Sequence, residues 1–113
     1  DLKAPLCSAA ATEPFITDAD TGSEWQIELT FDEEMDTTSF DFANGITNPD
    51  FTANMSYQGV NWTSDTSAIV RYTILDNNNE LLLPVNAAFL VGDVAGNVTL
   101  GCTVNVSIPI DTQ

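Results

Sequence analysis

Residues 97–110 read NVTLGCTVNVSIPI, in which every even position is apolar and every odd position is polar, glycine or proline. A period of two indicates a β-strand with one face in a core and one in solvent. Residues 25–31 (WQIELTF) and 68–74 (AIVRYTI) alternate in the same way, and residues 86–91 place Ala87, Phe89 and Val91 on one side. The sequence therefore predicts an all-β protein.

Weaker strand patterns cover residues 4–10, 38–43 and 51–59, with polar turns between the strands and no sustained period of 3.6. About seven short strands separated by such turns are typical of an Ig-like β-sandwich with Greek-key connections. A small β-barrel is the competing architecture. A length of 113 residues predicts one module spanning residues 1–113, with short linker segments at 1–4 and 110–113.

The charge balance is strongly acidic, with 17 Asp and Glu against Lys3 and Arg71 alone and a net charge of −15. Nucleic acids and anionic membranes bind clustered Lys and Arg, so neither is expected as a partner. No apolar run reaches the 18 residues that a membrane span requires, so membrane insertion is not expected either.

Catalytic patterns are scarce. The absence of His excludes Ser-His-Asp and Cys-His nucleophilic sites and His-bearing zinc sites within this chain. A phosphate-binding Gly-rich loop is missing too. A pair of catalytic carboxylates, as in glycosidases, remains an alternative because the chain has 17 acids. We expect a protein that is not an enzyme and binds hard cations, if any, through oxygen ligands.

Three motifs occur in order along the chain: FDEEMD at 31–36, WTSDT at 62–66 and DVAGN at 93–97. Together they resemble the bacterial Ig-like repeat family of tandem surface adhesins. The resemblance implies an extracellular, structural extender module whose partners are neighbouring copies joined head to tail. A self-assembling filament subunit joined by strand complementation and a carbohydrate-binding module with exposed Trp25, Trp62 or Tyr57 remain as alternatives.

The two cysteines lie near the starts of the first and last predicted strands. Those strands run parallel as neighbours in an Ig-like sandwich, so we expect a disulfide between Cys7 and Cys102, although two buried free thiols are the alternative. Tension applied to the two chain ends would then pass through the bridge and bypass the sandwich.

The predicted topology sorts the acidic residues by end of the sandwich. We expect one end to hold Asp18, Asp20, Asp76, Asn78, Glu80 and Asp111, and the other to hold Asp1, Glu33, Glu34, Asp36, Asp93 and Asn97. Head-to-tail stacking would join the two ends, and calcium bound there through Asp18, Asp20 and Asp111 would neutralise the repulsion. The alternative is that the acids serve solubility, and for Asp93 we expect a structural role in a turn with Gly96 at positive φ.

Four N-x-[ST] sequons begin at Asn54, Asn61, Asn97 and Asn105, a slight excess over the number that chance gives for this composition. Whether any of them carries a glycan stays open at the sequence level.

Overall fold

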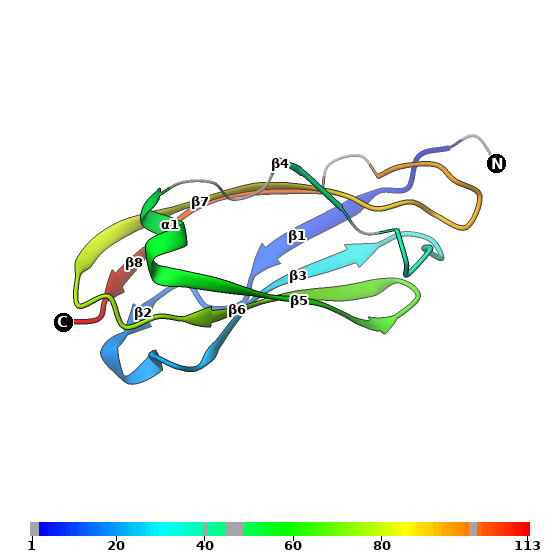
Figure 1. The fold of residues 1–113 in the computed structure, drawn as a ribbon. Helices are drawn as coiled ribbons and strands as arrows, with labels where there is room; N and C mark the ends of the chain where they lie inside the picture. The colour runs from blue at the N-terminus through cyan, green and yellow to red at the C-terminus, as the bar shows by residue number, and fades with distance from the viewer. Residues whose placement is uncertain (1–2, 40, 45–48, 100–101) are drawn as a thin grey trace.

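The computed structural model describes residues 3–39, 41–44, 49–99 and 102–113, and Asp1 lies outside these residues. Their order is β1 (Cys7–Ala11), β2 (Ile16–Thr17), a 3-10 turn η1 (Asp18–Asp20), β3 (Glu24–Phe31), β4 (Asp41–Asn44), α1 (Pro49–Asn54), β5 (Met55–Ser64), β6 (Ser67–Ile74), β7 (Glu80–Leu90) and β8 (Thr103–Asp111). The strands form two four-stranded sheets: sheet 1 in the order β1-β3-β6-β5 and sheet 2 in the order β2-β8-β7-β4 (Figure 1).

This arrangement confirms the predicted all-β Ig-like sandwich and rules against the barrel. The first predicted strand is divided: β1 pairs antiparallel with β3 in sheet 1, and β2 crosses to pair parallel with β8 in sheet 2. With β1 and β2 taken as one strand, the sheets have the order of an Ig-like Greek key.

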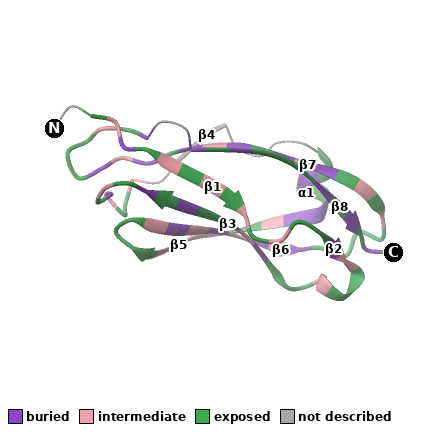
Figure 2. Ribbon diagram, turned by 180° about the vertical axis from the view of Figure 1, so that it is seen from behind, coloured by how far each residue is buried: buried purple, intermediate pink, exposed green. Residues whose placement is uncertain are grey.

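The core lies between the sheets and follows the alternation in the sequence. In β3 the inward set is Trp25, Ile27, Leu29 and Phe31, and in β6 every second residue from Ala68 to Ile74 is buried (Figure 2). Trp25 is fully buried and packs near Phe51 and Tyr72, with ring centroids 6.0 and 5.7 Å away. Burying an aromatic side chain contributes about 2–3 kcal/mol, so this cluster anchors one end of the core.

Three elements differ from expectation. Residues 49–54 form a short helix, favoured by Pro49 at its first position, so β5 begins at Met55 instead of 51. β7 begins at Glu80, six residues before the alternating pattern that starts at residue 86, so Glu80 lies in a strand. β8 begins at Thr103 and includes Ile110 and Asp111, which were expected in a linker.

The sandwich is long and thin, with principal extents of 51 × 21 × 17 Å. The N- and C-terminal ends of the described chain lie at opposite ends of the long axis (Figure 1). We call the end with residues 32–39 and 91–99 the N-terminal pole, and the end with residues 18–23 and 75–79 the C-terminal pole.

Candidate functional site

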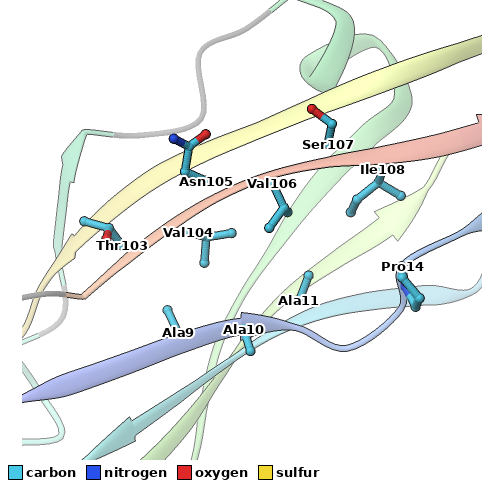
Figure 3. Close-up of a pocket in the computed structure, with 10 residues that line it drawn as sticks. All are labelled: Ala9, Ala10, Ala11, Pro14, Thr103, Val104, Asn105, Val106, Ser107 and Ile108. Carbon is cyan, nitrogen blue, oxygen red and sulfur yellow. The ribbon is translucent and has the colours of Figure 1, made fainter.

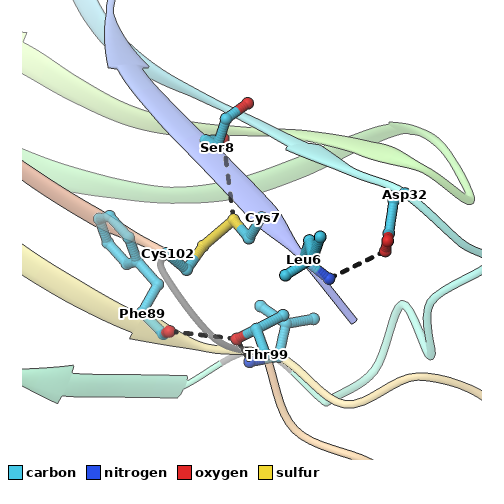
Figure 4. Close-up of a disulfide and its surroundings, with 8 residues drawn as sticks. Leu6, Cys7, Ser8, Asp32, Phe89, Thr99 and Cys102 are labelled. Atoms are coloured by element: carbon cyan, nitrogen blue, oxygen red, sulfur yellow. Dashed lines mark hydrogen bonds between the residues drawn. A yellow bond between two sulfur atoms is a disulfide. The ribbon is translucent and has the colours of Figure 1, made fainter. Parts of the chain in front are cut away.

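The predicted disulfide is present at the N-terminal pole. Cys7 is the first residue of β1, buried Cys102 directly precedes β8, and their Cα atoms are 4.8 Å apart (Figure 4). The Cys102 carbonyl also accepts a hydrogen bond of 2.9 Å from the Phe89 amide, which fixes it beside β7. The bridge therefore ties the edge of sheet 1 to sheet 2.

The acids of the C-terminal pole come from two segments that meet. Thr17 pairs with Asp111, so the turn η1 with Asp18 and Asp20 begins beside the end of β8. The Asp20 carboxylate is already in use, since Oδ2 accepts hydrogen bonds from the Thr17 amide at 2.8 Å and the Thr17 hydroxyl at 3.2 Å. The geometry thus brings the predicted calcium residues to one pole.

These acids do not assemble a metal centre within one copy. Among the described residues, no group of three or more His, Cys, Asp or Glu could hold a metal ion. Calcium needs six or more oxygen ligands, so binding at this pole requires oxygen atoms from a second copy or from water.

Asp93 has the structural role that the sequence predicts. Its buried carboxylate Oδ1 accepts hydrogen bonds from the Ala95 amide at 3.0 Å and the Asn97 amide at 2.8 Å. The Asn97 side-chain amide donates to Oδ2 at 3.2 Å, and Gly96 closes the turn with a φ of +91°. A positive φ favours glycine, so DVAGN is a self-supporting turn.

A second carboxyl group reaches this turn from the loop after β3. A hydrogen bond to Asp93 raises the pKa of the half-buried Glu33 carboxyl, and the same bond is the main cause of a lowered pKa at Asp93. This hydrogen bond, between residues 60 apart in sequence, therefore favours the protonated form of Glu33 and the charged form of Asp93.

This pairing predicts a pH dependence of folding. Because the pKa of Glu33 is raised in the folded state, Glu33 stabilises the fold fully below its ordinary pKa of 4.5, and this stabilisation is lost as pH rises through the raised pKa. Asp93 stabilises the fold above its ordinary pKa of 3.8, and this stabilisation is lost only as pH falls through the lowered pKa. Glu33→Gln keeps a donor to Asp93 at every pH, so it should raise the melting temperature at pH 7 and change little at pH 4.

Thermal melting of both proteins between pH 3 and 8 measures this difference. Glu34→Gln removes the same charge from the neighbouring, exposed position and serves as the control. An equal gain from Glu34→Gln would mean that only the general acidity of the pole matters.

The aromatic residues considered for sugar binding are mostly occupied in packing. Trp25 is fully buried, and Trp62 stacks on Phe31 with ring centroids 5.5 Å apart. Tyr57 is 48% exposed and contacts Tyr72 edge to face. Together they form no flat, exposed platform.

The sequons divide by exposure. Asn54 is buried and its amide donates to the Asp50 carbonyl at 2.7 Å, while the Asn97 amide donates to Asp93. Asn61 and Asn105 are exposed on β5 and β8, so they are the two most accessible sequons, whereas Asn97 is half-buried.

Both basic residues form ion pairs with acids. Lys3 Nζ lies 3.7 Å from Asp32 Oδ2, and Arg71 Nε lies 2.6 Å from Glu24 Oε1. Lys3 precedes β1 and Arg71 lies on β6, each beside its own acid, so the two form no basic patch. No helix of the described chain is long and apolar enough to cross a membrane.

Comparison with known proteins adds no further constraint. A scan against protein-family models and searches of curated proteins and of solved structures found no match. The function is therefore argued from this geometry and from the motifs in the sequence.

Proposed function

We propose that this chain is a structural extender module of an extracellular adhesin or surface fibre and has no enzymatic activity. One observation carries the proposal: the chain ends lie at opposite poles of a body 51 Å long, and the bridge joins the first strand to the segment that leads into the last. A module built in this way transmits tension along its axis.

The expected environment and partners agree with this role. Disulfides persist in oxidising compartments, and both cysteines of this chain are in the bridge, which supports a location outside the cell. The partners are neighbouring copies of the module, joined head to tail at the acidic poles.

The alternative of a filament subunit has one observation in its favour. β8 presents an unpaired edge beside β1, where a strand of another copy could add. In that case a terminal segment of one copy would complete the sheet of the next. The carbohydrate-binding alternative is favoured only by the partly exposed ring of Tyr57.

Proteins that contain one, two and three copies of the module in series test the extender role. In small-angle X-ray scattering, each added copy should lengthen the particle by about its 51 Å long axis. A pair joined through a long Gly-Ser linker is the control for a flexible joint. A directly joined pair as compact or as variable in length as the control would refute an extender role.

Calcium is proposed to stiffen the junction through Asp18, Asp20 and Asp111, with the rest of the ligands from the N-terminal pole of the next copy. The directly joined pair should then gain thermal stability with calcium, about 2.7 kcal/mol at a concentration 100 times the dissociation constant. A single copy should gain little, because one pole offers too few oxygens.

Calcium titrations of the single copy and the pair measure this difference. Asp111→Asn should remove most of the gain, whereas Glu28→Gln removes one charge from an exposed site in the middle of β3 and should not. A melting temperature that does not change with calcium in either the single copy or the pair would assign the acids to solubility alone.

A further inference from the structure

The flank of the sandwich between β1 and β8 is an open apolar groove. It has a volume of about 410 Å³, and Val104, Val106 and Ile108 point into it from β8 while Ala9 and Ala11 line it from β1 (Figure 3). Val106 has the inward parity of buried Val104 and Ile108, yet 45% of it is exposed. The core is therefore uncovered at this point.

The main chain of β8 is unpaired along the same flank. The Phe89 amide donates to the Cys102 carbonyl, so the main chain of Cys102 faces β7. In an antiparallel pair every second residue faces the same neighbour, so the main-chain groups of Val104, Val106 and Ile108 also face β7. The N–H and C=O groups of the residues between them therefore face the groove, and these residues are Thr103, Asn105 and Ser107. In the described part of the chain, β2 covers this edge of β8 only at Ile110 and Asp111.

The outer strands on the opposite flank, β4 and β5, carry features that discourage strand addition, whereas this edge does not. β5 has two register shifts, one of them at Gly59, and β4 is four residues long with a shift of its own. β8 pairs with β7 without a shift from Thr103 to Asp111. Residues 7–12 and 102–110 contain no charged side chain in a chain with 17 acids. Bulges, short strands and charges are the usual protection of sheet edges, so this flank is unprotected.

We propose that this flank binds a second copy of the chain, with the two β8 strands antiparallel about a two-fold axis at Asn105. Thr103 then lies opposite Ser107 of the second copy, and about six main-chain hydrogen bonds form between them. On the inner face, Val104 packs beside Val106 of the second copy, so each exposed valine is covered. On the outer face, Asn105 lies opposite itself.

The sequence of β8 favours a second copy over another partner. Residues 103–107 (TVNVS) pair with themselves in this register, with valine beside valine and small polar residues opposite each other. Two chains of charge −15 repel each other, and the flank is the region where they approach with the fewest charges in contact. The association is therefore lateral, goes beyond the end-to-end contacts of the extender, and should strengthen as salt screens the repulsion.

Sedimentation velocity of the 113-residue chain at increasing concentration, in low and high NaCl, tests the proposal. We expect a monomer–dimer equilibrium that shifts to dimer in high salt. Asn105→Asp places two like charges opposite each other at the axis and should weaken the dimer by at least about tenfold. Asn61→Asp makes the same change at an exposed position of β5 in the other sheet and should not weaken it.

A cysteine at the axis checks the register independently of any effect on folding. Under mild oxidation, Asn105→Cys should form a disulfide-linked dimer, because facing hydrogen-bonded residues of antiparallel strands have Cα atoms about 5.5 Å apart. Asn61→Cys should cross-link far less. The proposal would be overturned by a chain that stays monomeric in high salt, or by equal effects of the substitutions at positions 61 and 105 in either assay. These outcomes do not depend on the length measured for tandem copies.

Discussion

Removal of the disulfide by Cys7→Ala and Cys102→Ala should lower the free energy of unfolding by about 4–5 kcal/mol. The bridge joins residues 95 apart in sequence and so restricts most of the unfolded chain. A domain of this size is usually stable by only about 5–15 kcal/mol, so the variant should be close to its folding limit at 37 °C. Urea denaturation followed by tryptophan fluorescence measures the change, since buried Trp25 reports on the core.

The single variants provide the control. Each single variant, Cys7→Ala or Cys102→Ala, already opens the loop, so each should lose nearly as much free energy of unfolding as the double variant. Reduction of the native chain should reproduce this loss without changing any side chain. A loss below about 1 kcal/mol on reduction would show that the unfolded chain gains little freedom and that the bridge is not a main source of stability.

The sequence predicts the sheets well because alternation reports burial directly. β3 and β6 bury the residues that their period of two selects, and Cys7 and Cys102 meet because the Ig-like order brings the first and last strands together. Val98 and Val106 share the inward parity of β8 but are 47% and 45% exposed. Val98 precedes the strand and Val106 faces the open flank. The alternation in the sequence shows neither where the strand begins nor which edge of it stays uncovered.

The short helix escapes prediction for a different reason. Residues 49–54 make fewer than two turns, so no period of 3.6 can appear, and only Pro49 followed by Asp50 signals a helix start.

The candidate sites show the same division between local and distant information. The role of Asp93 is predictable because its partners Ala95, Gly96 and Asn97 are its sequence neighbours. Its contact with Glu33 is not, because the two residues are brought together only by the packing of two loops. The groove between β1 and β8 likewise depends on which strand edges remain unpaired, although the run SAAA at 8–11 is a signal of small side chains there.

The second large effect concerns extension under force. Tension from the N-terminal end reaches Cys7, crosses to Cys102 at the same pole and follows β8 to the C-terminal pole. β8 is already extended over its nine residues, and the chain between the two cysteines carries no load. Unfolding of the bridged module should therefore release only a few tens of ångströms. With the bridge open, the residues between the cysteines add about 300 Å of chain.

Single-molecule force spectroscopy of this module, placed between domains of known unfolding length, tests the load path most directly. The oxidised chain should show no step near 300 Å, and the same molecules in reductant, or the variant without cysteines, should show one for each module. A step of about 300 Å in the oxidised chain would contradict the account, because tension would then pass through the sandwich and not through the Cys7–Cys102 bridge.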